Sequence, residues 1–354
     1  NAIAIGHTAN AVGINSTAVG TSAQAEADYA SSYGTLANAS GIASMAFGAQ
    51  ANASETGAIA HGVNSIASGA NSSTFGTAST ATKEDAIAFG YSAAASGLDA
   101  IAIGTSSVAS ETNSTAIGTE AKATKVNSSA FGDAAEASGN QATALGAGAL
   151  ATQQNATAVG EKAEASGTQS TAVGRQSLAS KHDATALGTV SKATGERATA
   201  IGVLTKANRK CSTAVGALAV ADGFLSQAFG ANATASGENS SAVGSYATST
   251  NSRSTAIGTG SATTRDDQLM LGKAATEVTV ANLSGTGTSL IVANGDGTLS
   301  RSTISDNGLE SLNCEGNGTD AVCYGPGANA TGKYTTAIGA EANASAATNS
   351  TDSG

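Results

Sequence analysis

The apolar and polar residues of this chain follow a period of fourteen. Glycine recurs at Gly6, Gly20 and every fourteenth position to Gly272, which makes twenty repeats without insertion or deletion. The residue just before this glycine is Ile, Val, Leu or Phe in 18 of the 20 repeats, with Tyr33 and His61 as exceptions. Alanine stands two before the glycine in 17 repeats. Because loops normally tolerate changes of length, the constant spacing indicates that each repeat stacks on the next.

Each repeat carries two short segments whose residue character alternates, which is typical of β-strands. One segment ends at the apolar residue before the glycine, as in "STAI" at 114–117, and the other surrounds the alanine five after it, as in "AKA" at 121–123. Glycine and polar residues lie between them, where tight turns form. A coiled coil could also repeat every fourteen residues, but recurrent glycines and β-branched residues disfavour helix. The pattern predicts an all-β fold, a parallel solenoid of 14-residue rungs with two strands each, over residues 1–272.

Side-chain volume predicts which positions face inwards. A narrow two-sheet roll has room only for methyl-sized groups at its centre, and protein interiors leave few voids. We therefore expect the alanine positions two before, three after and five after the glycine to fill the interior. In the middle of the chain these residues are Ala102, Ala116, Ala121, Ala123 and Ala137.

Strand alternation then turns the residue before the glycine outwards. A single chain would expose a continuous apolar ridge, and monomers rarely leave large apolar patches uncovered. We expect other copies of the chain to cover this ridge in a cyclic homo-oligomer. The position four after the glycine is mixed and often charged, so the second sheet can face water. The predicted interface residues are Ile103, Ile117, Phe131, Leu145, Val159, Val173 and His61.

Composition narrows the classes of function. The net charge of −10 is spread thinly over 354 residues with no evident basic patch, which argues against nucleic acid as a partner. No apolar stretch is long enough to span a membrane. His7, His61 and His182 lie on separate repeats without a paired nucleophile or acid, so we expect no enzyme, no catalytic residue and no cofactor.

His61 has two interpretations. Repeated around an oligomer axis, it could form a ring that binds an anion or a metal. The plainer interpretation, which we favour, is a histidine that forms an ordinary hydrogen bond in a rung packed less tightly against the other copies. No carboxylate is evident to support a metal-bound imidazole. We therefore predict no metal site.

The phrases "NSTAIG" at 113–118, "ATAVGEKAEASG" at 156–167 and "STAVGRQSLAS" at 170–180 resemble the head repeats of trimeric autotransporter adhesins, the YadA-like left-handed parallel β-roll. The resemblance covers residues 1–272 without a break and resumes near the end. It implies a homotrimer, so two further copies of the chain as partners, and a location on the bacterial cell surface. The heads of that family are held away from the outer membrane by a stalk and an anchor. Neither is evident here, so we expect a head fragment whose only link to the membrane is through such an anchor.

Beyond Gly272 the period fails. Residues 277–283 and 289–293 are predicted strands, and "NGDG" at 294–297 predicts a tight turn. We interpret residues 273–305 as a β connector that closes the roll. Gly325 and Gly339 restore the spacing, which predicts the start of a second head segment, with a polar tail, at 306–354.

Two cysteines of this last segment fall at inward positions. Cys314 and Cys323 could form a disulfide, which would persist at a cell surface, or remain two buried thiols.

The leading hypothesis for function is an adhesin head. The resemblance implies attachment to extracellular-matrix proteins, cells or abiotic surfaces, and repetition along a rod would strengthen weak contacts. An ice- or crystal-surface binder is the alternative, because threonine recurs three before the glycine from Thr115 onwards. A β-helix enzyme would need a cluster of carboxylates, which the repeats do not show.

Overall fold

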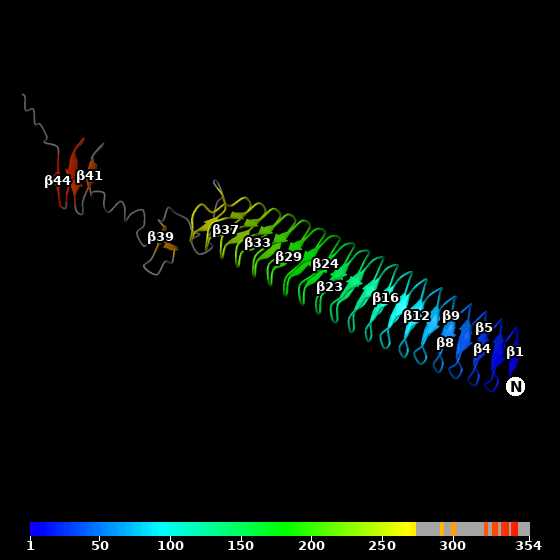
Figure 1. The fold of residues 1–354 in the computed structure, drawn as a ribbon. Coiled ribbons are helices and arrows are strands. Elements are labelled where there is room, and N and C mark those ends of the chain that lie inside the picture. Colours follow the sequence, from blue (N-terminus) through cyan, green and yellow to red (C-terminus); the bar gives the residue numbers. More distant parts are fainter. Residues whose placement is uncertain are drawn as a thin grey trace, which may run out of the picture. The chain divides into compact units, whose positions relative to one another are not determined.

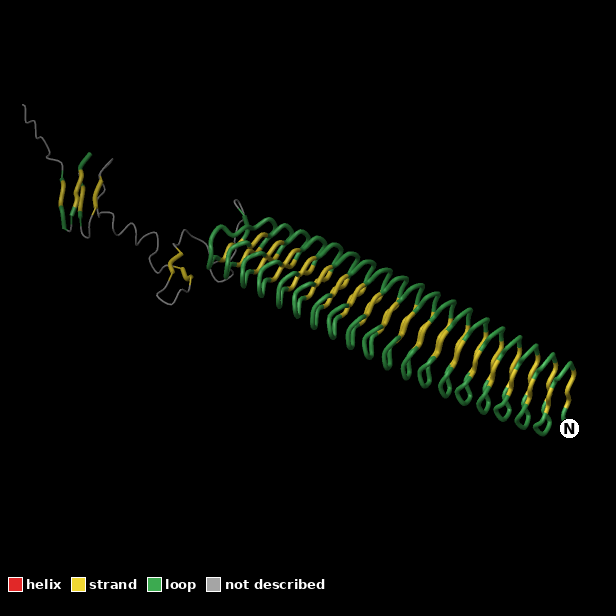
Figure 2. The backbone as a smooth tube through the Cα atoms, viewed as in Figure 1, coloured by secondary structure: helices red, strands yellow, loops and turns green. Residues whose placement is uncertain are grey.

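The computed structural model describes residues 1–273, 291–293, 299–301, 322–324, 328–331, 334–339 and 341–345. Contacts divide the chain into two units, Asn1–Thr276 and Glu277–Gly354. Within the described ranges all regular structure is strand, and no helix long and apolar enough to cross a membrane occurs there. The first unit is one continuous stack of rungs (Figures 1 and 2).

One strand of each rung belongs to a sheet that we call sheet 1, and its last residue directly precedes the recurrent glycine. Its strands are β1 (Ile3–Ile5), β3 (Thr17–Val19), β5 (Ser31–Tyr33), β7 (Met45–Phe47), β9 (Ile59–His61), β11 (Ser73–Phe75), β13 (Ile87–Phe89), β15 (Ile101–Ile103), β17 (Thr115–Ile117), β19 (Ser129–Phe131), β21 (Thr143–Leu145), β23 (Thr157–Val159), β25 (Thr171–Val173), β27 (Thr185–Leu187), β29 (Thr199–Ile201), β31 (Thr213–Val215), β33 (Gln227–Phe229), β35 (Ser241–Val243), β37 (Thr255–Ile257) and β38 (Leu269–Leu271).

The first eighteen rungs each contribute a second strand to sheet 2, which contains the alanine five after the glycine in all of them but the last. Its strands are β2 (Asn10–Ala11), β4 (Gln24–Ala25), β6 (Asn38–Ala39), β8 (Asn52–Ala53), β10 (Ile66–Ala67), β12 (Thr80–Ala81), β14 (Ala94–Ala95), β16 (Val108–Ala109), β18 (Lys122–Ala123), β20 (Glu136–Ala137), β22 (Leu150–Ala151), β24 (Glu164–Ala165), β26 (Leu178–Ala179), β28 (Lys192–Ala193), β30 (Lys206–Ala207), β32 (Val220–Ala221), β34 (Thr234–Ala235) and β36 (Thr248–Ser249).

Neighbouring rungs pair in parallel with an offset of fourteen residues. In sheet 1, Thr115, Ala116 and Ile117 lie opposite residues 129–131, and in sheet 2 Lys122 lies opposite Glu136. Because adjacent strands lie about 4.8 Å apart, twenty rungs extend roughly 90 Å. The predicted all-β parallel solenoid is confirmed.

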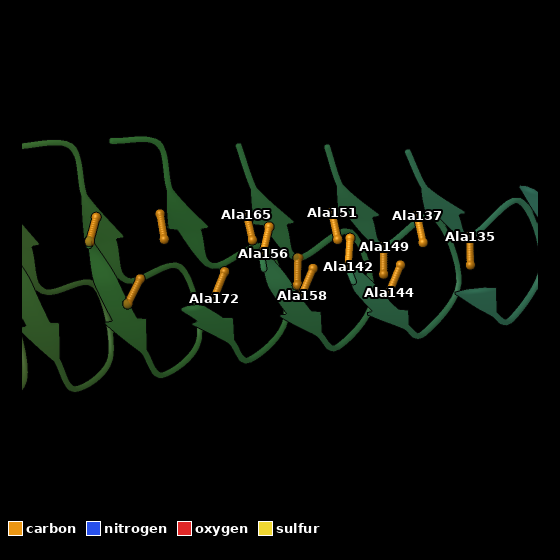
Figure 3. Packing of buried hydrophobic residues seen from close by; sticks show 14 of the residues in the cluster. Ala135, Ala137, Ala142, Ala144, Ala149, Ala151, Ala156, Ala158, Ala165 and Ala172 are labelled. Atoms are coloured by element: carbon orange, nitrogen blue, oxygen red, sulfur yellow. The ribbon is translucent and has the colours of Figure 1, made fainter. Parts of the chain in front are cut away.

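The core of the first unit consists of methyl and hydroxyl groups. In one rung Ala142 and Ala144 of the sheet 1 side meet Ala149 and Ala151 of the sheet 2 side, and all four are fully buried (Figure 3). The five alanines expected to face inwards are also fully buried, and they are Ala102, Ala116, Ala121, Ala123 and Ala137. Threonine is the largest side chain that is fully buried between the sheets, at Thr74 and Thr205.

A fourth inward position lies four before the glycine and was not anticipated from the sequence. It holds Ala or Ser in every rung but the last, which has Gln268, and these residues are buried from Ser16 to Ser254. Most of the serines remain compatible with the interior because their hydroxyls bond to the backbone of the adjoining corner, whereas the hydroxyls of Ser16, Ser44 and Ser240 are buried without a hydrogen-bond partner. Ser114 Oγ, for example, donates to the carbonyl of Glu111 at 2.6 Å.

Two corners close each rung, and both require left-handed backbone. In one rung Glu120 has φ 57° and Asn127 has φ 56°. Their own N–H groups donate to carbonyls of the preceding rung, from Glu120 to Thr105 at 2.8 Å and from Asn127 to Thr112 at 3.0 Å. Gly118, with φ 137°, has its Cα so close to the next rung that an added Cβ would overlap the carbonyl of Gly132. Corners that are hydrogen-bonded along the stack explain why the repeat length never changes.

The interior changes character at the C-terminal end of the stack. Ser249 and Thr263 replace the alanine five after the glycine, and both are buried. Their hydroxyls join Ser254, with Ser249 Oγ 2.8 Å and Thr263 Oγ1 3.2 Å from Ser254 Oγ. Buried hydroxyl groups need such partners.

The second unit contains two described pieces. Strands β39 (Ile291–Ala293) and β40 (Leu299–Arg301) pair antiparallel. The predicted strand 277–283 and the predicted turn at 294–297 lie outside the described residues. Strands β41 (Val322–Tyr324) and β43 (Thr336–Ile338) pair in parallel at the fourteen-residue offset, as do β42 (Asn329–Ala330) and β44 (Asn343–Ala344). The division of this region at residues 305 and 306 remains a prediction.

Replacing Ala144 by Leu should lower the free energy of unfolding of the stack by about 1–3 kcal/mol, because the interior cannot expand around the added atoms. Chemical denaturation followed by circular dichroism measures this change. Glu136→Leu places the same side chain on the outer side of sheet 2 and should alter stability by less than about 0.5 kcal/mol. Equal effects of the two variants would show that the interior is not tightly packed.

Val190→Asn should stabilise the stack by about 1 kcal/mol, because Val190 is a β-branched residue held at φ 58° and asparagine tolerates this region better. The midpoint of denaturation measures the gain. The same change at Val220, which lies in strand β32 and not at a left-handed corner, should give no comparable gain. A loss of stability at both positions would contradict the assignment of strain to Val190.

Candidate functional site

The outer side of sheet 1 carries a continuous apolar column, which we define as the residues just before the recurrent glycine. In β17 the buried Ala116 alternates with Thr115 and Ile117, which point out of the roll and are half-buried. Of the predicted interface residues, Leu145 and His61 are exposed and the others are half-buried, namely Ile103, Ile117, Phe131, Val159 and Val173. None of these side chains belongs to the alanine core of the first unit. Their contact with other chains remains a prediction.

Aromatic rings occupy five successive positions of the apolar column. The ring of Tyr33 stacks on that of Phe47 with centroids 4.8 Å apart, and Phe75 lies 5.8 Å from Phe89. The imidazole of His61 is between these pairs, edge-on to Phe47 at 6.0 Å and to Phe75 at 5.6 Å. Sequence reasoning treated the histidine as an isolated exception. The signal that it continues an aromatic ladder was present in the five consecutive rungs.

The same face carries a threonine column, three residues before the glycine. Six threonines follow one another in register in strands β21 to β31, each half-buried. They are Thr143, Thr157, Thr171, Thr185, Thr199 and Thr213. Sheet 1 therefore presents a hydroxyl column beside an apolar one.

The outer side of sheet 2 and the corners beside it are more polar. Asn38 Nδ2 donates to Asn52 Oδ1 at 3.2 Å, and Asn113 Nδ2 to Asn127 Oδ1 at 3.1 Å, in each case across one rung. Aliphatic residues such as Leu150 and Leu178 interrupt this face and are half-buried. Sheet 2 thus lacks the uniform apolar column of sheet 1.

A bidentate ion pair lies on one corner near the end of the stack. Arg253 donates from Nε to Asp267 Oδ1 at 2.6 Å and from Nη2 to Asp267 Oδ2 at 2.8 Å. These hydrogen bonds lower the pKa of the Asp267 carboxyl below its ordinary value. Both side chains are exposed, so solvent screens the pair and it contributes little to stability.

The remaining candidate residues lie apart from one another. His7, His61 and His182 occupy different rungs, and His182 Nδ1 lies 2.9 Å from Asp183 Oδ2 on the surface. Cys211 is a free, half-buried thiol at a corner. The backbone of Cys323 is in β41, while its side chain and all of Cys314 lie outside the described residues. In the part of the chain that the structure describes, no three His, Cys, Asp or Glu side chains are grouped to hold a metal.

The YadA head domain repeat matches most of the chain. The matched residues are 1–23, 11–37, 39–65, 60–82, 67–93, 81–107, 95–121, 123–149, 151–177, 179–205, 221–247, 235–261 and 317–351. The chain belongs to the YadA head domain repeat family. The match at 317–351 includes Gly325 and Gly339, so the YadA repeat resumes after the interruption, as the sequence spacing predicted.

A search of solved structures gives a similar chain in the collagen-binding domain of the Yersinia adhesin YadA. The two are 18% identical, with 73% of this chain and 82% of that chain covered and a TM-score of 0.16. No curated protein matches the chain.

Proposed function

We propose that this chain is the head of a bacterial cell-surface adhesin, and that three copies associate through the outer side of sheet 1. Membership of the YadA head repeat family supports the adhesin role. The observation that carries the assembly is the apolar column, interrupted only by His61 in the first unit, in which Phe89 and Leu145 are 55% and 48% exposed in the single chain. Contiguous apolar surface of this extent is normally covered by a partner.

Symmetry supports a closed ring of like subunits. A rod with one apolar sheet can bury that sheet on every copy only if the sheets converge on a common axis. The resemblance to trimeric autotransporter adhesins supports three as the number of copies. Sheet 2 and the corners then face solvent and remain available to a target.

Attachment follows from repetition along the rod. Three parallel stacks of twenty rungs would present many equivalent weak contacts, and linked contacts bind far more tightly than single ones. The targets that we propose are extracellular-matrix proteins, cells or other surfaces. Segments outside this chain would anchor the head to the outer membrane.

The threonine column supports a second candidate, binding to an ice or crystal surface. Six hydroxyls in register on one sheet give the regular spacing that such a lattice requires. The trimer would bury this face, so the two proposals exclude each other. Thermal hysteresis of the purified chain would measure binding to ice directly.

Light scattering should give a mass three times that of the 33.7 kDa chain. Ile117→Lys combined with Val159→Lys should yield a folded monomer, because buried unpaired ammonium groups at the axis are strongly unfavourable. Leu150→Lys with Leu178→Lys introduces the same charges on sheet 2 and should leave the trimer intact. A stable monomer of the unchanged protein would refute the assembly.

The purified trimer should bind immobilised collagen, fibronectin or laminin in a surface plasmon resonance assay. The monomeric Ile117→Lys/Val159→Lys variant should bind at least about a hundredfold more weakly, because it loses avidity and keeps its sheet 2 surface. The Leu150→Lys/Leu178→Lys trimer controls for added charge. No binding by the trimer, or equal binding by the monomer, would count against the proposed adhesion.

A further inference from the structure

Basic residues gather on one part of an otherwise acidic chain. Residues 181–210 contain six of the 16 Lys and Arg residues and only two carboxylates, which gives +4 within a chain of net charge −10. The basic residues are Lys181, Lys192, Arg197, Lys206, Arg209 and Lys210, and each is exposed. The sequence alone predicted no basic patch, because these six basic residues are spread over thirty positions. Stacking of rungs every fourteen residues brings them onto one strip.

Two lysines at the centre of this basic strip are direct neighbours. Lys192 of β28 lies opposite Lys206 of β30 in the parallel register. Leu178 precedes them in the same column and Val220 follows, so no carboxylate flanks the pair. Like charges in register are unfavourable in a sheet. Earlier in the same column Lys122 faces Glu136, which is the favourable arrangement.

The adjoining corner extends the strip. Arg209 and Lys210 lie there, with Arg197 one rung earlier. Lys210 Nζ is 3.1 Å from Glu196 Oε1, which neutralises one of these charges. In the described part of the chain, no ion pair involves Lys192, Lys206 or Arg209.

Hydrogen-bonding side chains lie between the lysines and the corner. Thr194 Oγ1 lies 3.1 Å from Asn208 Oδ1, and Asn208 Nδ2 donates to Asp222 Oδ1 at 3.1 Å. Past Arg209, a shallow hollow of about 490 Å³ is lined by Asp222 and Glu238 as well as by Arg209 and Lys210. Those carboxylates mark the end of the surface that an anion would favour.

We propose that the basic strip binds a linear sulfated polysaccharide. Lysine and arginine form strong charge-assisted hydrogen bonds with oxyanions, and a sulfate between Lys192 and Lys206 would remove their mutual repulsion. Thr194 and Asn208 provide hydroxyl and amide groups suited to sugar hydroxyls. A nucleic acid is disfavoured because the whole chain is acidic. The strip lies on sheet 2 and the adjoining corner. Binding of a polysaccharide there therefore does not depend on whether other copies of the chain cover sheet 1.

Heparin affinity of the full chain tests the proposal. The protein should bind heparin with an affinity that falls as salt rises, because counterions are released on binding. The variant Lys192→Gln/Arg197→Gln/Lys206→Gln/Arg209→Gln should bind at least about tenfold more weakly. The control Lys83→Gln/Lys122→Gln/Lys125→Gln/Lys162→Gln removes the same number of exposed charges elsewhere and should change affinity less than about twofold. Circular dichroism checks that both variants keep the fold.

Three outcomes would overturn the proposal. They are equal binding by the strip variant and the unchanged protein, equal affinity for heparin and for desulfated heparin, and competition by duplex DNA as effective as by heparin. The proposal takes its extracellular setting from the adhesin function, but the two can fail separately. If the protein binds collagen, fibronectin or laminin but not heparin, the adhesin proposal is unaffected. If it binds heparin but none of these three proteins, the proposal for the basic strip is unaffected.

Discussion

The narrow space between the two sheets of each rung determines the rest of the molecule. Only methyl and hydroxyl groups fit there, as Ala142, Ala144, Ala149 and Ala151 show within one rung. In the first unit every side chain larger than threonine therefore points outwards, where it is at most half-buried in the single chain. The stack gains its cohesion from parallel hydrogen bonding and close alanine packing, and its bulky residues become available for association with something else.

The backbone at the corners reinforces this constraint. Left-handed residues such as Glu120 and Asn127 donate their N–H groups to the preceding rung, so each corner is fixed relative to its neighbour. Side chains at equivalent positions consequently stack in ladders. Whether a ladder is aromatic, hydroxylic or basic depends only on which residues occupy that column, so one backbone can carry several chemically distinct strips.

Much of the fold could be predicted from the sequence because the fourteen-residue period fixes the register directly. The solenoid, the inward alanines and the family followed from that period. The inward position of Ser114 was missed because serine is usually read as a surface residue, and its bond to Glu111 is visible only in three dimensions. The aromatic ladder through His61 and the lysine pair Lys192–Lys206 were also missed, although the period places these neighbours in register, because each residue was considered only within its own rung. Cys314 precedes the matched repeat at 317–351, whereas Cys323 lies within it, opposite Ala337 in the parallel pair of β41 and β43.

The direction of the interstrand hydrogen bonds has a mechanical consequence. In a parallel stack these bonds lie along the long axis, so a pull between the two ends loads the rungs in series. The least cohesive rung then sets the force at which the rod opens, however many rungs there are. Rungs with few packed alanines occur at Ser72, Thr74 and Ser79 as well as at Ser249 and Thr263. Under tension, rupture would begin at such a rung and progress rung by rung, which would make the rod a force limiter.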